Sequence, residues 1–302
     1  MDRRKTMERL ERTFQSFGFV PIDTPILEYT EILLGKGGGE TDKQLYRFED
    51  NGGRDVAMRF DLTVPFARYM AEHYHDLYLP FRRYHMAKVY RGENTQRGRY
   101  REFAQCDFDI VGSDTLSADV ETLELIVASF DAIGTPAVKI HVAHRGLFNR
   151  FLERLGAAEQ SEEILRTVDK LRKVGAEKTR DDLAQRAGEA AAKEILRFIE
   201  GTSDWRQTLE LATELAGGEH EDTRRMGAIF EVAERIGIAP RLIFDPSITR
   251  GLDYYTGVVF ETFLEDLPGI GSVCSFFNYT AIAEIYTKHV LPGVGASIGL
   301  DR

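Results

Sequence analysis

Apolar side chains recur every three or four positions at the start of the chain, with charged residues between them. This spacing predicts a helix over 2–17. The recurring apolar residues are Met7, Leu10, Phe14 and Phe17. Gly18 ends the pattern, and an extended segment follows as far as Leu27.

Alternation of apolar and polar positions predicts strands through the first half of the chain. Asn51-Gly52-Gly53 joins the first two strands and has the composition of a hairpin turn. The polar loop 92–98 separates the next two strands. The predicted strands lie at 46–48, 56–60, 83–91, 102–111 and 138–142, and the predicted helices between them at 63–73 and 119–130.

Residues 145–237 differ from the rest, because they are rich in Ala, Glu, Leu, Lys and Arg at helical spacing and contain no proline. They predict an all-helical insertion. Strand patterns return afterwards, at 242–244, 257–264, 272–274 and 294–298. Hairpins with helices grouped apart indicate an α+β fold with an antiparallel sheet. The chain then divides into a first part of the core at 1–144, the insertion at 145–237 and a second part of the core at 238–302.

The composition is that of a globular protein, with 43% hydrophobic and 29% charged residues over 302 positions. The 39 basic and 49 acidic residues give a net charge of −10, which excludes a generally basic surface for nucleic acid. The chain has no signal-peptide pattern and no apolar run of membrane length, and its only cysteines are Cys106 and Cys274, so we expect a cytoplasmic location. The seven histidines show no metal-ligand spacing, so no protein-bound metal is expected.

The segment from Arg82 to Arg101 carries seven basic residues and a single acid, Glu93. Guanidinium groups bind phosphate oxygens in a planar fork, so a polyphosphate ligand is one interpretation. A solvated hairpin tip is the other, and the segment alone does not separate them.

The strand that follows places Gln105, Asp107 and Asp109 on one face and apolar residues on the other. Two carboxylates and an amide in a row could hold an ammonium group or an imidazole, although an amphipathic edge strand facing water has the same pattern. Near the end, Pro292 to Arg302 has glycine at every second position over 293–299, apart from Ser297. Missing side chains on one face allow a flat ligand or another backbone to approach closely.

These segments together resemble the class II aminoacyl-tRNA synthetases, and the histidyl-tRNA synthetase family in particular, over nearly the whole chain. Four segments carry the resemblance in order: Ile22-Asp23-Thr24-Pro25 resembles motif 1, Tyr90-Arg91-Gly92-Glu93 with 97–103 resembles motif 2, Arg250 to Tyr255 resembles the histidine-specific RGLDYY signature, and Gly299-Leu300-Asp301-Arg302 resembles the start of motif 3.

The resemblance implies an antiparallel sheet flanked by helices, with a helical insertion. It implies activation of histidine with ATP and Mg²⁺, transfer to tRNA(His), a homodimer formed through motif 1, and no membrane association. The anticodon-binding domain that follows motif 3 in the family is not expected in this chain, so binding of tRNA(His) is expected to be weakened.

The resemblance also assigns roles to individual residues. The implied ATP-binding residues are Arg91 for the α-phosphate, Glu93 for the adenine edge, Arg302 for the γ-phosphate, and Arg99 and Tyr100 beside them. The implied amino-acid-binding residues are Asp61, Thr63, Gln105, Asp109, Arg250, Tyr254, Tyr255 and Tyr279. Arg91, Arg250 and Arg302 are the implied catalytic residues.

One segment departs from the family pattern. Family members carry a Gly-Gly-Arg-Tyr-Asp loop where this chain has Phe276-Phe277-Asn278-Tyr279-Thr280. Two phenylalanines in place of glycines are expected to crowd the amino-acid pocket. A non-charging paralogue that acts as a binding module, such as a regulatory subunit of ATP phosphoribosyltransferase, or a deliberately reduced core therefore stands as an alternative to the enzyme.

Overall fold

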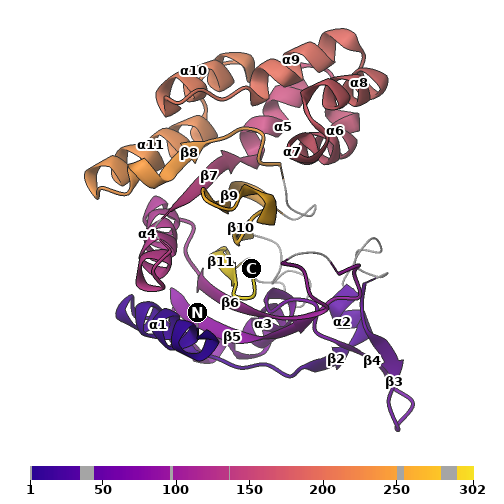
Figure 1. Ribbon diagram of the computed structural model, residues 1–302, viewed down its shortest axis with the longest axis vertical. Helices are drawn as coiled ribbons and strands as arrows, with labels where there is room; N and C mark the ends of the chain where they lie inside the picture. Colours follow the sequence, from indigo (N-terminus) through magenta and orange to yellow (C-terminus); the bar gives the residue numbers. More distant parts are fainter. Residues whose placement is uncertain (1, 35–43, 96–97, 136, 250–254, 280–290) are drawn as a thin grey trace. The chain divides into compact units, whose positions relative to one another are not determined.

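The computed structural model describes residues 2–34, 44–95, 98–135, 137–249, 255–279 and 291–302. The chain forms two compact units (Figure 1). The first unit comprises Met1–Ala137, Asp266–Ser275 and Tyr279–Arg302, and the second comprises Val138–Glu265 and Phe276–Asn278.

The main sheet of the first unit has the strand order β1-β5-β6-β11-β10. Antiparallel pairing joins β5 to β6 and β6 to β11, as the alternation along these segments predicts. Parallel pairing occurs where the two-residue strand β1 lies beside β5, so the sheet is mixed. The bounds are β1 (Val20–Pro21), β5 (Phe81–Tyr90), β6 (Glu102–Val111), β10 (Cys274–Tyr279) and β11 (Gly293–Gly299).

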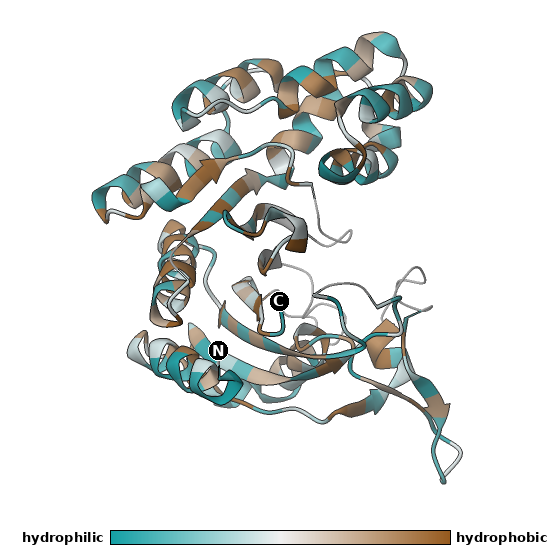
Figure 2. Ribbon diagram, in the orientation of Figure 1, coloured by the Kyte–Doolittle hydropathy of each residue, from teal (hydrophilic) through white to brown (hydrophobic). Residues whose placement is uncertain are grey.

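Two helices cover the apolar face of this sheet, α1 (Arg3–Ser16) and α4 (Leu116–Ala132). The carboxylate of Asp2 accepts the backbone N–H of Arg4 and so caps α1, and Gly18 follows its end with φ +79°, a conformation that glycine adopts without strain. The Phe14 ring lies 5.1 Å from the Phe108 ring of β6. Figure 2 shows mainly hydrophobic residues along α4, which fits a helix buried on several sides.

A smaller three-stranded sheet and two helices complete the first unit. The strand order of this sheet is β2-β4-β3, and the predicted turn at Asn51-Gly52-Gly53 joins β3 to β4. The bounds are β2 (Leu27–Tyr29), α2 (Thr30–Leu34), β3 (Arg47–Glu49), β4 (Asp55–Met58) and α3 (Thr63–His73), and short 3₁₀ helices occur at Tyr74–Asp76 and Pro268–Ile270.

Apart from residues 276–278 of β10, the described residues of the second unit form strands in the order β9-β7-β8 and a group of helices (Figure 1). The alternate residues Val138, Ile140 and Val142 of β7 are fully buried. β9 pairs antiparallel with β7, and β8 pairs parallel with it. The bounds are β7 (Val138–His144), α5 (Arg145–Arg154), α6 (Ser161–Asp169), α7 (Leu171–Val174), α8 (Ala176–Ala187), α9 (Glu189–Ile199), α10 (Trp205–Leu215), α11 (Glu221–Arg235), β8 (Leu242–Phe244) and β9 (Tyr255–Leu264), with 3₁₀ helices at Ala158–Gln160 and Ala239–Arg241.

Candidate functional site

Polar side chains lie on one face of three adjacent strands of the first unit, opposite the face that α1 and α4 cover. The strand register places them in three rows, and small residues of β11 end each row. The rows are Arg83–Asp109–Gly295, His85–Asp107–Ser297 and Ala87–Gln105–Gly299. Because β6 lies between β5 and β11, the interpretation of 102–111 as an edge strand facing water is excluded.

The middle row is buried and incompletely hydrogen-bonded. Burial raises the pKa of Asp107 to about 7, although Arg83 and a hydrogen bond from Ser297 act in the opposite direction. Burial and two arginines lower the pKa of His85 to about 4, although its Nε2 lies 3.0 Å from Asp23 Oδ1. His85 Nδ1 and Asp107 Oδ1 find no hydrogen-bond partner within the described part of the chain. Such buried polar atoms are expected where a site receives a polar ligand.

Gln105 and Asp109 occupy the two outer rows. Gln105 donates from Nε2 to Ser297 Oγ at 2.7 Å, and its carbonyl oxygen is buried with no partner among the described residues. Asp109 Oδ2 lies 2.5 Å from Nη2 of the fully buried Arg83. Gln105 and Asp109, both predicted to bind the amino acid, therefore lie on the polar face of β6, on either side of Asp107.

Asp61 and Thr63 lie at the start of α3. The carboxylate of Asp61 accepts the backbone N–H of Val64, in the first turn of the helix, at 3.0 Å. Burial raises the pKa of Asp61, and nearby Arg91 and Arg83 oppose this shift. The Arg83 guanidinium stacks on Phe66 of α3 at 4.0 Å, so this arginine brings the start of α3 close to the polar sheet face.

Arg91 follows the last residue of β5, and contacts with Phe60 and Phe103 hold its side chain. Its guanidinium carbon lies 4.3 Å from the centre of the Phe60 ring and 5.1 Å from that of Phe103, and its Nε donates to the Phe60 carbonyl at 3.2 Å. Burial lowers the pKa of Arg91 from its very high usual value, and the guanidinium stays charged. The site thus contains a positively charged guanidinium in a fixed position, and the charges of Asp61 and Glu93 favour its charged form.

The other predicted ATP-binding residues lie along the connection from β5 to β6 and at the chain's end. Arg99 Nη1 lies 3.2 Å from Glu93 Oε2, and Tyr100 is half exposed. Arg302 donates from Nε to the carbonyl of Gly98 at 3.2 Å and from Nη1 to the carbonyl of Ser272. Arg302 and the motif 2 loop are therefore in direct contact.

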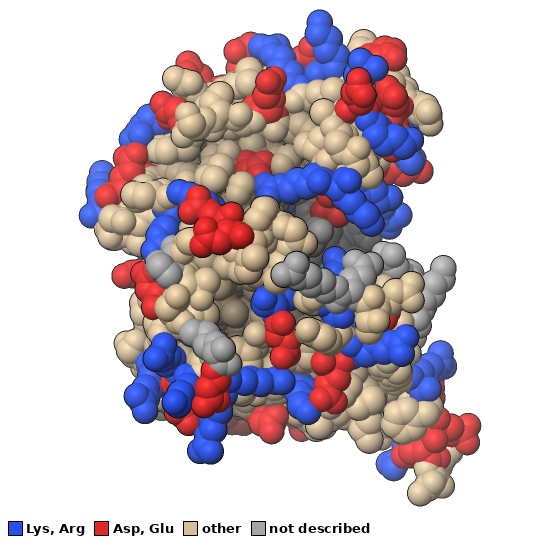
Figure 3. Space-filling view, in the orientation of Figure 1, with Lys and Arg blue, Asp and Glu red and all other residues tan. Residues whose placement is uncertain are grey.

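The basic segment 82–101 does not act as one cluster. Arg82 forms two hydrogen bonds with Glu121 of α4, at 2.8 and 2.9 Å, and Lys88 pairs with Glu102. Arg83 is buried against Asp109, so none of these three residues is free for a phosphate ligand. Over the visible face of both units, Figure 3 shows basic and acidic side chains interspersed, in keeping with the net charge.

Several predicted residues lie outside the described residues. These are Arg250, Tyr254 and Thr280, together with the side chains of Tyr255 and of 276–279 in the departing segment. Within the described ranges, no three His, Cys, Asp or Glu side chains gather so as to hold a metal ion. In the same ranges no helix has both the length and the apolar character needed to cross a bilayer.

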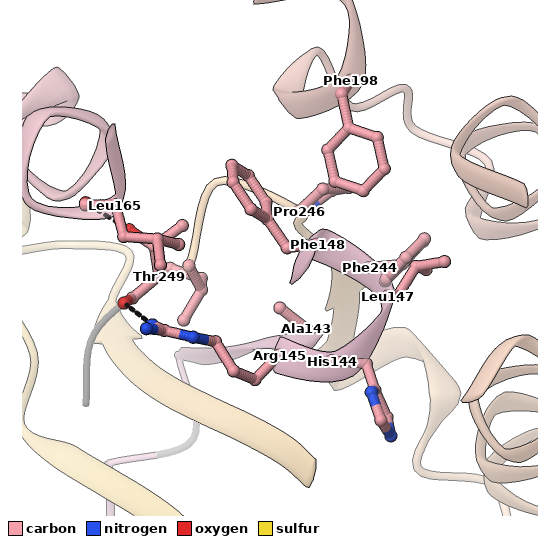
Figure 4. Close-up of a pocket in the computed structure, with 11 residues that line it drawn as sticks. Ala143, His144, Arg145, Leu147, Phe148, Leu165, Phe198, Phe244, Pro246 and Thr249 are labelled. Atoms are coloured by element: carbon pink, nitrogen blue, oxygen red, sulfur yellow. Dashed lines mark hydrogen bonds between the residues drawn. The ribbon is translucent and has the colours of Figure 1, made fainter. Parts of the chain in front are cut away.

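A separate small pocket lies within the second unit and contains none of the predicted site residues (Figure 4). Its walls are mainly apolar, with Phe148, Phe198 and Phe244 among them, and Arg145 donates to the Thr249 carbonyl at 3.0 Å. The mainly apolar walls offer few groups to a polar ligand, so this pocket is not a candidate for a polar binding site.

Sequence reasoning did not identify Arg83 and His85 as part of the polar face. Their alternation with Tyr84 and Met86 was the available signal, because residues two apart in a strand share a face. The surrounding run of basic residues concealed this signal.

The sequence of this chain matches histidyl-tRNA synthetases both in a family model and in individual relatives. The family model for histidyl-tRNA synthetase matches residues 1–302. The histidine–tRNA ligase of Treponema denticola is 57% identical over the whole chain, which spans 69% of that relative, and the one of Treponema pallidum is 49% identical, with 70% of it spanned. These matches confirm the resemblance drawn from the motifs.

Solved structures agree with this result. A histidyl-tRNA synthetase from Nostoc aligns with a TM-score of 0.88 at 30% identity, covering 99% of this chain and 69% of that one. A Bacillus halodurans structure described as an ATP phosphoribosyltransferase regulatory subunit/histidyl-tRNA synthetase aligns at 0.85 over 99% of this chain and 77% of its own, but at 23% identity it bears on the fold alone. The expected fold class, an α+β class II synthetase-like fold, is confirmed.

Proposed function

This chain belongs to the histidyl-tRNA synthetase family, and we propose that it activates histidine with ATP and transfers the histidyl group to tRNA(His). The observation that carries the proposal is the polar face of β5, β6 and β11. Beside it lies motif 2, in which the Arg91 N–H bonds to the Arg101 carbonyl and which Arg302 contacts at Gly98. Acidic groups suit the ammonium group of an amino acid, and arginines suit the phosphates of ATP.

In the proposed first step, a carboxylate oxygen of histidine attacks the α-phosphorus of ATP. The bond from this phosphorus to the bridging oxygen of pyrophosphate breaks, and histidyl-adenylate forms. Positioning and charge neutralisation supply most of the rate in such reactions. The stacked guanidinium of Arg91 is proposed to neutralise the α-phosphate, and Arg302 the γ-phosphate. ATP is expected to enter with Mg²⁺ on its phosphates, which lowers their negative charge.

The amino-acid subsite is proposed to lie along the acidic face. Asp61 and Thr63 would bind the ammonium group, with Gln105 and Asp109 supporting the rest of the amino acid. Arg250 and the three tyrosines at 254, 255 and 279 are proposed to complete the subsite. Glu93, Arg99 and Tyr100 are proposed to surround the adenine.

A second copy of the chain is the proposed partner at motif 1. A groove lies between α1 and the segment 21–26, and apolar side chains beside it are unusually exposed. Val20 is 46% exposed, Ile26 43% and Leu27 49%. Apolar surface of this kind is typical of an interface between protein chains. Within each copy, residues 145–237 are proposed to form a helical insertion in the core.

The test is ATP–pyrophosphate exchange, measured with histidine, without it, and with a panel of other amino acids. We expect exchange that depends on histidine, and loss of ATP binding in Arg91→Ala. Lys88→Ala is the matched control, because Lys88 pairs with Glu102 at an exposed position and is expected to leave ATP affinity unchanged. Unchanged ATP affinity in Arg91→Ala would contradict the assigned role.

The phenylalanines at 276 and 277 favour a second candidate, a binding module that does not charge tRNA. ATP binding without exchange for any amino acid would support this candidate. Exchange with an amino acid other than histidine would indicate a pocket of altered specificity. Glycines at both positions are expected to strengthen histidine binding if the pocket is crowded.

A further inference from the structure

Arg83 is the only arginine whose side chain is completely buried among the described residues. It is the third residue of β5 and lies between Val20 of β1 and Asp109 of β6 in the strand register. A guanidinium cannot lose its charge in a protein, so it needs compensating groups at this position.

Two contacts join this guanidinium to separate parts of the proposed amino-acid subsite. Its Nη2 lies 2.5 Å from Asp109 Oδ2, and its central carbon lies 4.0 Å from the centre of the Phe66 ring. Phe66 belongs to the first turn of α3, the helix that begins at Thr63. Arg83 therefore connects the carboxylate on β6 with the helix start that carries Asp61 and Thr63.

Its charge also acts on the other carboxyl groups of this face. The positive charge of Arg83 lowers the pKa of both Asp61 and Asp107, against the larger effect of burial. Arg83 thus acts on three carboxyl groups of this face, and Arg91 acts on Asp61 and Asp107 as well. A face with several carboxyl groups suits an ammonium ligand.

The hydrogen bonds of Arg83 are not those of a purely structural ion pair. A buried structural arginine normally has its donors satisfied, because each unsatisfied donor is costly. Here Nε, Nη1 and Nη2 all lack a hydrogen-bond acceptor among the residues that the structure describes, so the contact with Asp109 is an ion pair by distance and not a hydrogen bond. The contacts of the Arg83 guanidinium are thus the stacking on Phe66 and the ion pair with Asp109.

We propose that Arg83 is a positioning residue of the amino-acid subsite, which fixes Asp109 relative to the start of α3. This inference rests on the proposed function, because it assumes that these residues bind the amino acid. Arg83 acts through Asp109 and α3, so its loss affects the amino acid and not ATP.

The test compares Arg83→Lys with Arg82→Lys in the full 302-residue chain. Lysine keeps the charge and loses the planar fork and the stacking surface. Arg82 is the matched control, because it is the neighbouring residue and points to the opposite face of the sheet. It forms a bidentate pair with Glu121 through two hydrogen bonds. Dissociation constants for L-histidine and for ATP are measured separately by calorimetry, with KM values from ATP–pyrophosphate exchange.

We expect Arg83→Lys to weaken histidine binding by about tenfold or more, because displacement of a positioned group by about 1 Å has effects of this size. ATP affinity should stay within about twofold of the wild type, a difference well under 1 kcal/mol. Arg82→Lys should leave both constants unchanged. Equal weakening of histidine and ATP binding, or no change in either, overturns the proposal.

A second variant covers the case in which Arg83→Lys does not fold. Phe66→Leu keeps every charge and most of the apolar volume but removes the ring on which Arg83 stacks. It should also weaken histidine binding selectively, and unchanged histidine affinity in this variant overturns the proposal.

The same measurements separate this inference from the proposed function. If the wild type binds histidine but gives no exchange, the proposed reaction fails and the histidine dissociation constants still decide the role of Arg83. If the wild type does not bind histidine, both are overturned.

Discussion

Gly295 faces Asp109 so closely that a Cβ atom at position 295 would lie 2.1 Å from Asp109 Oδ1. The two residues are register partners on β11 and β6. The sequence suggests that the glycines of β11 leave space for a ligand, and at this position the space is taken by the carboxylate of Asp109. At Gly299 the nearest neighbour of the Cβ position is the Val273 carbonyl oxygen at 3.7 Å, an ordinary van der Waals contact, so a methyl group would fit there.

Gly295→Ala should therefore displace Asp109 and also press on the Phe108 carbonyl, 2.6 Å from the new methyl group. We expect a loss of about 1–3 kcal/mol in the free energy of unfolding, together with weaker histidine binding. Gly299→Ala is the control, since its nearest neighbour, the Val273 carbonyl, is 3.7 Å away. Urea unfolding and histidine titration measure both effects. A Gly295→Ala protein as stable as the control would show that Asp109 does not occupy this space.

His85 and Asp107 should give opposite contributions to the pH dependence of stability. The pKa of Asp107 is about 7 against a usual 3.8, so the folded state keeps a proton that the unfolded state loses, and stability falls as pH rises between these values. The pKa of His85 is about 4 against a usual 6.5, so the unfolded state carries the extra proton and stability rises with pH over that range.

Single variants should reveal each contribution. Asp107→Asn is expected to gain stability relative to the wild type as pH rises from about 4 to 8, by on the order of 4 kcal/mol. His85→Gln should gain stability relative to the wild type as pH falls from about 6.5 to 4. Unfolding free energies across this pH range provide the measurement, and parallel profiles for the wild type and either variant would contradict the assigned titration.

Asp245 is expected to stabilise the second unit through His141 and Arg172. Burial raises the pKa of Asp245, but hydrogen bonds from His141 and Ser247 and the charge of Arg172 bring it down to about 2. The lowered pKa contributes stability above the usual value of 3.8, and this contribution is lost as pH falls towards 2.

Asp245→Asn should thus lower the free energy of unfolding at neutral pH by about 2 kcal/mol, with a smaller effect below about pH 3. Asp182→Asn is the control, because Asp182 pairs with Lys178 on an exposed helix face, where about 0.5 kcal/mol or less is expected. Thermal unfolding at several pH values compares the two. An equal loss in both variants would show that the His141–Asp245–Arg172 cluster adds nothing beyond a surface pair.

Asp301 connects the end of the chain to the sheet and to α1. Its Oδ2 accepts the backbone N–H of Ala104 at 2.7 Å, and its carboxylate pairs with Arg3 at 3.2 Å. Asp301→Ala leaves the N–H of the buried Ala104 without this acceptor and should cost about 1–3 kcal/mol. Arg3→Ala removes only the exposed ion pair and should cost less than about 1 kcal/mol. Similar losses in urea unfolding would mean that the backbone hydrogen bond is not the main contribution.

Much of the fold could be predicted from local pattern. The segment 63–73 forms a helix and 102–111 a strand with the predicted bounds, because periods of 3.6 and 2 identify which side chains share a face. The four motifs in order predicted the family. Arg91, Gln105 and Asp109 were identified in this way, as residue types at recognisable positions; their proposed roles remain to be tested.

The tertiary structure decided which charges meet. Arg82 and Arg83 are adjacent and chemically identical in the sequence, yet one pairs with Glu121 on the helix side and the other is buried against Asp109. Likewise, His85 and Asp107 become neighbours only through the register of β5 and β6. The direction in which β1 pairs with β5 is also set only when the two strands meet. Periodicity assigns a side chain to a face. The partner across that face, and the burial that shifts its pKa, depend on strands that are distant in the chain and meet only after folding.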